Sequence, residues 1–283
     1  MSIDSTWLRC PNCLLDLESV ADRVYGCASG HRFDRAKHGY LTLLPPRAPR
    51  TIGDDREMLT ARAALLDRGA FSPIADAVAA MAAAAAVGDA EGTRRIADLG
   101  CGTGYYSARL SDSGPPAGLL LADRSPDAVR MALRAAPGST GVVLDIWRPL
   151  PLRTGSADVI LDIFAPRNPT EFARVLRPGG RLVVVVPRAS HLAELREEGT
   201  LLDIPAEKAA AVADQLRPAG LDVVDSAHVT HRLVADGAMR DALRGMGPTA
   251  HHAATSTAAP EPTTGDERVV TVDVDVIGFA HSA

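Results

Sequence analysis

The sequence lacks any run of apolar residues approaching the roughly 18 that a membrane-spanning helix needs. Its first residues, MSIDSTWLRCPNC, also lack the apolar segment behind a basic start that marks a secretory signal. Basic residues are outnumbered, with 30 Lys and Arg against 35 Asp and Glu, which excludes a uniformly basic coat for nucleic acid but allows a local basic patch. We therefore expect a soluble, cytoplasmic protein without membrane partners. What the chain has is 46% hydrophobic residues in 283, enough for the core of one large or two modest domains.

Cysteine is scarce, and three of the four cysteines fall within the first 27 residues. Cys10 and Cys13 form a C-x2-C pair, and Cys27 forms a second close pair with His31. Two such pairs are typical of a closed, tetrahedral Cys3His zinc site, which replaces the core that a short segment cannot build. We predict a structural zinc, because a catalytic zinc keeps an open coordination position and all four ligands are used here. The alternative is that the cysteines stay reduced and pack as small hydrophobes.

Two parts precede the main domain. Residues 1–45 are the predicted zinc ribbon. Residues 46–93 begin with a stretch rich in Pro and Arg that is typical of a linker, and they continue with two predicted helices over residues 57–67 and 73–87. Ser72 stands where a serine commonly caps a helix, so we expect it to cap the second one.

Residues 94–283 form the main domain. From Arg94 on, short apolar runs alternate with helical segments of about ten residues, which is typical of βαβ units and a buried parallel sheet. Two later segments, 221–234 and 267–279, alternate apolar and polar residues and are predicted to close the sheet as an antiparallel pair. Between them, residues 236–265 are interpreted as a substrate-side insertion. The predicted fold class is therefore α/β, with a Rossmann-like sheet behind an N-terminal zinc ribbon.

A glycine-rich turn follows the first predicted strand of that sheet. In the run IADLGCGTGY, Gly100, Gly102 and Gly104 come just after the acid Asp98 and open a helix. Glycines at this point let the backbone approach a ligand at the switch point of the sheet. Asp98 would repel a pyrophosphate but suits the amino group and sulfonium of S-adenosylmethionine. A nicotinamide cofactor would need the spacing G-x-G-x-x-G, which is missing.

Two more acids end the next two predicted strands. Asp123 is placed to accept the ribose hydroxyls of a nucleoside, and Asp145 lies where a carboxylate or a neighbouring amide meets the adenine edge. Three acids at three successive strand ends outline a nucleoside-shaped pocket. The alternative is that Asp123 and Asp145 only cap the helices that follow. Cys101, inside the glycine turn, is most simply a small residue, since no neighbouring base is evident to activate it.

One segment of this acidic protein is basic. Between residues 32 and 50, five cations oppose the single acid Asp34, and two aromatic residues are interleaved: Arg32, Arg35, Lys37, Arg47 and Arg50, with Phe33 and Tyr40. Guanidinium groups and aromatic faces bind phosphates and unstacked bases, so this segment is the predicted nucleic-acid contact. The alternative is a solvated charged face with two core aromatics.

These motifs resemble those of a known family. The DLGCGTG turn and the LRPGG turn at residues 176–180 resemble the class I S-adenosylmethionine-dependent methyltransferases. Together with the ribbon and the segments HRFDRAKHGYLTLL, ARAALLDRGAF, DIFAPRNP, PRASHLAEL and MGP, nearly the whole chain is similar to the RlmA-type 23S rRNA guanine-N1 methyltransferases, most of all to their tylosin-resistance branch. The resemblance implies a structural zinc and a cofactor pocket that uses Phe71, Gly102, Thr103 and His191. On spacing alone, Phe71 is also consistent with a core residue and His191 with a cap.

The resemblance further implies methyl transfer to N1 of a guanine in a hairpin loop of 23S rRNA. Macrolide resistance is a hypothesis on the same ground, and a homodimer is left open. N1 lies on the Watson–Crick edge, so the target must be unpaired or flipped out. N1 of neutral guanine is a poor nucleophile, so a base, or a donor that stabilises charge on O6, would help. Asp162, at the end of the fourth strand, and Arg167, just beyond it, are the candidate catalytic residues.

Two other classes of protein stay open. A methyltransferase that acts on a small-molecule natural product would keep the cofactor pocket and use the ribbon and residues 236–265 as a lid, and the net charge of -5 favours it. A non-catalytic RNA-binding protein would have a disrupted cofactor motif. None is seen in this sequence.

Overall fold

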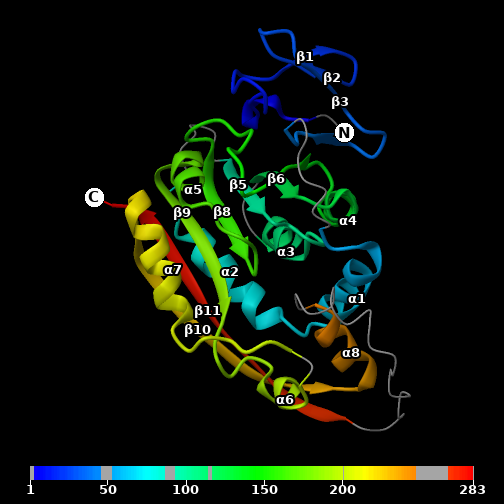
Figure 1. Ribbon diagram of the computed structural model, residues 1–283, viewed down its shortest axis with the longest axis vertical. Coiled ribbons are helices and arrows are strands. Elements are labelled where there is room, and N and C mark those ends of the chain that lie inside the picture. The colour runs from blue at the N-terminus through cyan, green and yellow to red at the C-terminus, as the bar shows by residue number, and fades with distance from the viewer. Residues whose placement is uncertain are drawn as a thin grey trace.

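The computed structural model describes residues 3–45, 53–86, 93–113, 117–199, 201–246 and 267–282. The strands of its main sheet are β4 (Tyr40–Thr42), β5 (Arg94–Leu99), β6 (Ala117–Asp123), β7 (Thr140–Val143), β8 (Ala157–Ile163), β9 (Leu176–Pro187), β10 (Leu221–Ala235) and β11 (Arg268–His281). Within the described residues they form one eight-stranded sheet in the order β10-β11-β9-β8-β5-β6-β7-β4 (Figure 1).

The sheet is mostly parallel. All neighbours from β9 across to β4 pair in parallel, as the buried apolar runs predicted. Every residue of β8 is buried, as expected for a strand that is covered on both faces. β11 pairs antiparallel with both β9 and β10, which confirms the predicted closing pair. The predicted α/β fold class is therefore confirmed.

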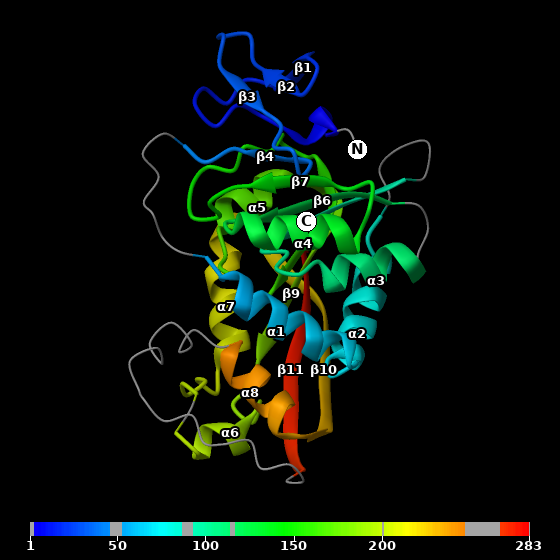
Figure 2. The ribbon, with the colours of Figure 1, turned by 90° about the vertical axis from the view of Figure 1, so that its right-hand side faces the viewer.

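Helices cover both faces of the sheet. They are α1 (Arg56–Asp67), α2 (Ser72–Ala83), α3 (Tyr105–Ser113), α4 (Pro126–Ala135), α5 (Pro169–Val175), α6 (Ala193–Glu197), α7 (Lys208–Leu216) and α8 (Gly237–Gly245). Figure 2 shows α1 to α4 on the side nearest the viewer. Apolar side chains of α2 and α4 belong to one hydrophobic cluster with the sheet, and those of α5 and α7 belong to a second cluster with the opposite face.

The two helices predicted before the main domain are present, but their ends differ. α1 begins after Asp55, whose side chain accepts a hydrogen bond from the Met58 N–H at 2.9 Å. Ser72 does not cap the second helix, contrary to the prediction. Phe71 is the N-cap residue, and the Ser72 hydroxyl instead donates to the Gly69 carbonyl at 3.0 Å. α2 ends at Ala83, earlier than predicted, and the chain beyond it contacts β9, where the Ala86 N–H donates to the Gly179 carbonyl at 3.3 Å.

The N-terminal ribbon packs directly on the main sheet. Its own small antiparallel sheet contains β1 (Glu18–Ala21), β2 (Val24–Gly26) and β3 (Arg32–Asp34). The ring of Trp7 is 1% exposed, and the Arg95 guanidinium at the start of β5 lies 3.9 Å from its centroid. The chain then continues as β4, which pairs with β7 at the outer edge of the main sheet. Ribbon and sheet therefore share one hydrophobic cluster.

Part of the predicted substrate-side insertion falls on α8. The rest of it, after residue 246, lies outside the described residues. Among the described residues, no helix combines the length and the apolar character that crossing a membrane requires.

Candidate active site and zinc centre

The glycine turn between β5 and α3 is tightly enclosed. Gly100, Gly102 and Gly104 have φ of 96°, 49° and 81°, which is the left-handed region that favours glycine. A Cβ added at Gly104 would lie 2.6 Å from the Cα of Ala132 in α4, and one at Gly100 would lie 2.6 Å from the Cβ of Ala165 beyond β8. The turn therefore requires glycine both for its backbone and for the close approach of its neighbours.

Asp98 lies beneath this turn and is 3% exposed. Its carboxylate accepts a hydrogen bond from the Ser107 hydroxyl at 2.6 Å. Burial raises the pKa of Asp98 to about 7, and the Ser107 hydroxyl only partly offsets that effect. A buried carboxyl that titrates near neutrality is suited to a cationic ligand, which would stabilise its ionised form.

The other two acids are also at the carboxyl edge of the sheet. Asp123 accepts hydrogen bonds from the N–H of Gly102 at 3.0 Å and of Ser125 at 2.8 Å, so it ties the glycine turn to β6. Burial raises the pKa of Asp123. Asp145 pairs with Arg124 at 2.5 Å. Neither acid caps a helix, since Ser125 caps α4 and Asp145 leads into a turn.

Arg62 of α1 is a site residue that the sequence did not reveal. Its Nη1 lies 3.6 Å from where a Cβ on Gly102 would be, and it pairs with Asp54. The Tyr106 hydroxyl close by is buried without a hydrogen-bond partner among the described residues. Burial is the main cause that raises the pKa of Tyr106. Of its charged neighbours, Arg62 lowers this pKa and Asp98 raises it. A cation, an acid and a hydroxyl without a partner among the described residues therefore lie near the turn, and this combination fits an amino acid moiety such as that of S-adenosylmethionine.

Three rings come together beyond the strand ends. The centroids of Phe71, Phe164 and His191 lie 6.1 to 6.2 Å from one another. Phe71 is 2% exposed, whereas Phe164 is 41% exposed and has a left-handed φ of 53°. Burial lowers the pKa of His191 to about 4, so its ring is neutral at pH 7. The Asp273 N–H donates to His191 Nδ1 at 3.2 Å, which leaves the ring proton on Nε2.

Asp162 and Arg167 form a pair at the end of β8. Asp162 is fully buried, and Arg167 Nη1 lies 3.3 Å from its Oδ2. Burial raises the pKa of Asp162 to about 8, although Arg167 partly offsets the rise. Because Asp162 has no exposed surface, the group available to a ligand is the Arg167 guanidinium, whose side chain is 16% exposed.

The ribbon brings the four predicted zinc ligands together. The ligand atoms of Cys10, Cys13, Cys27 and His31 all lie within 4.8 Å of one another. His31 Nδ1 is 3.5 Å from Cys10 Sγ and 3.4 Å from Cys27 Sγ, and the sulfurs of Cys13 and Cys27 are 3.6 Å apart. A tetrahedral zinc with sulfurs at about 2.3 Å requires ligand atoms about 3.8 Å apart, so the four residues fit the ion.

Comparison with known proteins agrees with this geometry. A family model described as "RlmA, N-terminal" matches residues 8–50, and one described as "Methyltransferase domain" matches residues 96–180. A 23S rRNA (guanine(748)-N(1))-methyltransferase of Streptomyces fradiae is 41% identical over 87% of this chain and 86% of its own. The chain belongs to the RlmA-type 23S rRNA guanine-N1 methyltransferases. A Micromonospora griseorubida protein, provisionally named for the same class of activity, is 41% identical over 87% of each chain.

A solved structure supports the fold of this RlmA-type chain. One chain from a complex that contains the Haloferax volcanii Trm112 methyltransferase activator aligns with 82% of this chain and 100% of its own, with a TM-score of 0.52 and 18% identity. The family resemblance, the S-adenosylmethionine cofactor and the zinc ribbon predicted from the sequence are thus confirmed. The non-catalytic alternative is not supported.

The basic segment of this RlmA-type chain is only partly as predicted. Arg47 and Arg50 lie outside the described residues. Phe33 and Tyr40 are half-buried and pack against the two hydrophobic clusters, so only part of each ring faces solvent. The Arg32 guanidinium donates to the Cys27 and His31 carbonyls and thereby closes the zinc loop.

Proposed function

We propose that this protein transfers the methyl group of S-adenosylmethionine to N1 of a guanine in a hairpin loop of 23S rRNA. The observation that supports this most directly is the exposed ring of Phe164, two residues beyond the Asp162 carboxyl and next to Ala165, which abuts the glycine turn. An exposed aromatic face beside a cofactor pocket suits an unstacked base. The Streptomyces fradiae relative is named for guanine 748, so that position is the first to test.

The cofactor, when bound, supplies a methyl group on a positively charged sulfur. We assign Asp98 to its cationic end, Asp123 to the ribose hydroxyls and Asp145 to the adenine edge. Arg62 is available for the carboxylate once it exchanges its contact with Asp54 for that group. The backbone of Gly100, Gly102, Thr103 and Gly104 would hold the cofactor at this turn.

The target guanine would stack on Phe164. Phe71 and His191, which the family resemblance assigns to the cofactor pocket, also contact this ring from the protein side, and the neutral His191 has its Nε2 proton available to donate. Holding the base in one plane aligns N1 with the bond that must break, and such alignment is the larger part of catalysis in a displacement of this kind.

Arg167 is the group we assign to the guanine itself. As N1 takes the methyl group its proton passes to solvent water, and a guanidinium stabilises the negative charge that develops on O6 while the proton leaves. Asp162 acts through Arg167 and is therefore a positioning residue, since its buried carboxyl holds the guanidinium at 3.3 Å. Replacing Arg167 by Met should lower kcat while cofactor affinity is unchanged.

The test is primer extension on unmodified 23S rRNA after incubation with the protein and S-adenosylmethionine, because a methyl on N1 blocks base pairing and stops the polymerase. We expect one new stop, lost in Asp98→Ala and in the double variant Cys10→Ala/Cys13→Ala. Arg217→Gln, a surface change at a 64% exposed side chain, is the matched control and should keep the stop. No stop, with cofactor binding intact by calorimetry, would favour a small-molecule acceptor instead. Sedimentation of the same preparation distinguishes a monomer from a homodimer.

Macrolide resistance is the physiological outcome we propose, and a ribosomal substrate implies action in the cytoplasm. A methyl on a loop base near the site where macrolides bind would remove a hydrogen-bond donor and add bulk. The macrolide susceptibility of a sensitive host that expresses the wild-type gene is compared with that of the same host expressing the Arg167→Met variant. Equal susceptibility to every macrolide tried would contradict the proposal, even if the methyl mark is present.

A further inference from the structure

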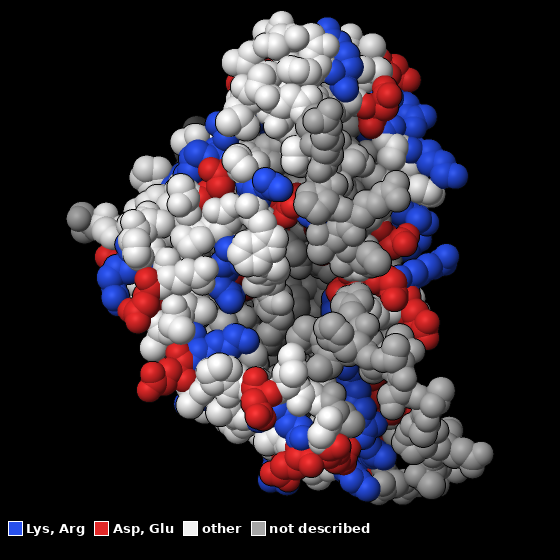
Figure 3. Space-filling model, in the orientation of Figure 1, with Lys and Arg blue, Asp and Glu red and all other residues white. Residues whose placement is uncertain are grey.

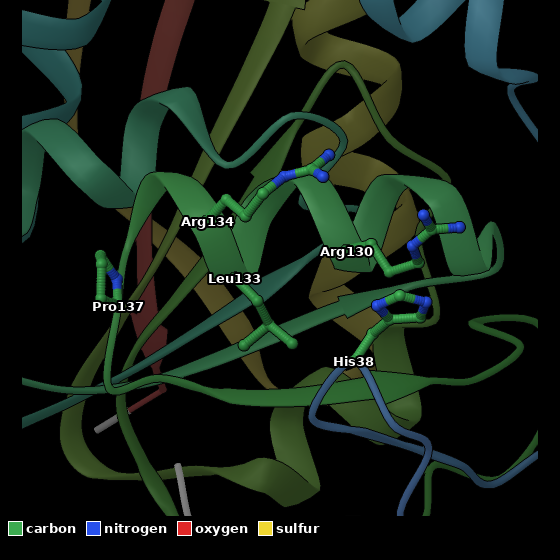
Figure 4. Close-up of a pocket in the computed structure, with 5 residues that line it drawn as sticks. All are labelled: His38, Arg130, Leu133, Arg134 and Pro137. Atoms are coloured by element: carbon green, nitrogen blue, oxygen red, sulfur yellow. The ribbon is translucent and has the colours of Figure 1, made fainter.

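A small cleft lies where the ribbon meets α4, away from the cofactor pocket. The turn of residues 35–39, between β3 and β4, forms one wall and α4 forms the other. The cleft has a volume of about 300 Å³ and is lined by His38, Arg130, Leu133, Arg134 and Pro137. Figure 4 shows that Arg130 and Arg134 extend from α4, whereas His38 comes from the turn.

The polar groups of this cleft are basic. His38 is exposed, and its pKa is lowered first by partial loss of solvent around the ring and then by the charges of Arg130, Lys37 and Arg134, so these groups are close together. Arg130 pairs with Asp127 at 2.8 Å. Among the described residues, no acidic side chain lies within ion-pair distance of Lys37 or Arg134. Figure 3 shows Lys and Arg side chains along the same edge, at the right below the ribbon.

The walls of the cleft are fixed in place. Leu133 at its base is 3% exposed, and a Cβ on Gly39 would be in contact with its Cδ1 at 3.9 Å. The turn is closed by the Gly39 N–H, which donates to the Ala36 carbonyl at 2.9 Å, and Tyr40 pairs with Gly141 in the main sheet. The positive groups therefore come from two parts of the chain that are held at a constant spacing, and this preorganisation reduces the cost of binding an anion.

We propose that this cleft binds a backbone phosphate of the substrate RNA. Two guanidinium groups with an imidazole and an ammonium group nearby suit a phosphodiester, which has two charged oxygens and no donor of its own. In a protein of net charge -5, a basic cleft in which only Arg130 has an acidic partner, Asp127, is the kind of local site that a polyanion requires. This inference rests on the proposed function, because it takes RNA as the occupant.

The position of the cleft suits the stem of the hairpin. α4 begins three residues after Asp123 of the cofactor pocket, and the cleft lies toward its other end. Ten helical residues span about 15 Å, so the cleft and the cofactor pocket lie toward opposite ends of one short helix. A stem strand held here would leave the loop base free to reach Phe164.

The test measures binding of a 23S rRNA hairpin fragment by fluorescence anisotropy at several salt concentrations. The double variant Arg130→Gln/Arg134→Gln removes two charges from the cleft. The matched control, Arg217→Gln/Arg232→Gln, removes two charges from exposed side chains at or beside β10, the opposite edge of the sheet. Cofactor binding by calorimetry checks that both variants are folded.

We expect the cleft variant to bind the fragment about sixfold more weakly at 0.1 M salt and to reduce the salt slope by about one, since one phosphate contact is lost. The control should stay within about twofold of wild type. Equal affinity and slope in the cleft variant and wild type would overturn the inference, and so would equal losses in the cleft and control variants. If wild-type protein neither binds nor methylates the fragment, the proposed function itself fails, and RNA is excluded as the occupant.

Discussion

Replacing Asp98 by Asn should remove most of the pH dependence with which this protein binds S-adenosylmethionine. Burial raises the pKa of Asp98 to about 7, so the carboxyl is ionised in roughly 90% of molecules at pH 8 and in roughly 10% at pH 6. A cationic ligand binds the ionised form, and below pH 7 most molecules must first lose a proton. The apparent Kd is the intrinsic value divided by the ionised fraction, so it should rise about tenfold from pH 8 to pH 6.

Calorimetry measures both parts of this prediction. At pH 6, in two buffers of different ionisation enthalpy, binding to wild-type protein should release close to one proton from this site. The amino group of the cofactor also titrates near pH 8, so Asp98→Asn, which keeps the size of the side chain and can accept the Ser107 hydrogen bond, supplies the baseline. If the affinity of the wild-type protein changes between pH 6 and pH 8 only as much as that of Asp98→Asn, the reasoning is refuted.

Two further predictions concern stability. Gly104→Ala should destabilise the fold by about 1 to 3 kcal/mol from backbone strain alone. The new Cβ would also meet the backbone of Ala132 at 2.6 Å, which adds to the cost. Urea unfolding measures the total loss of stability. An unchanged urea midpoint would contradict this prediction, because it would mean that α4 can shift to accommodate the new methyl group without cost. Chelation of zinc should expose Trp7 and shift its fluorescence to the red, while Trp147, already 66% exposed, contributes little change. The variant Trp7→Phe should abolish the shift, and a shift that survives in it would contradict the assignment to the ribbon.

Local patterns in the sequence were sufficient for the ribbon and the sheet. Cys10, Cys13, Cys27 and His31 are predicted from spacing because a four-coordinate ion leaves little choice of arrangement, and their ligand atoms do gather within 4.8 Å. The parallel strands are predicted from apolar runs because a strand buried on both faces has no polar alternation. The glycine turn is likewise local, since its conformation depends on its own residues.

Contacts between distant segments were not predictable in the same way. Arg62 lies on a helix whose own sequence does not indicate that it crosses the glycine turn 40 residues later. Phe164 is one apolar residue among several at the end of β8, and neither its left-handed φ nor its 41% exposure is indicated by the sequence. The complete burial of Asp162 is likewise not indicated by its position at the end of a strand. Its partner Arg167 depends on the path of the following loop.

The position of β4 also limits how this chain can be divided. Its three residues cover the outer edge of β7, which would otherwise present unpaired N–H and C=O groups. A fragment that begins after the ribbon would expose this edge together with the apolar face on which Trp7 packs, and open parallel edges are templates for aggregation. In this protein the ribbon is therefore not an exchangeable recognition module. It completes the sheet of the enzyme, so a ribbon-deleted fragment is expected to be insoluble rather than merely unable to bind RNA.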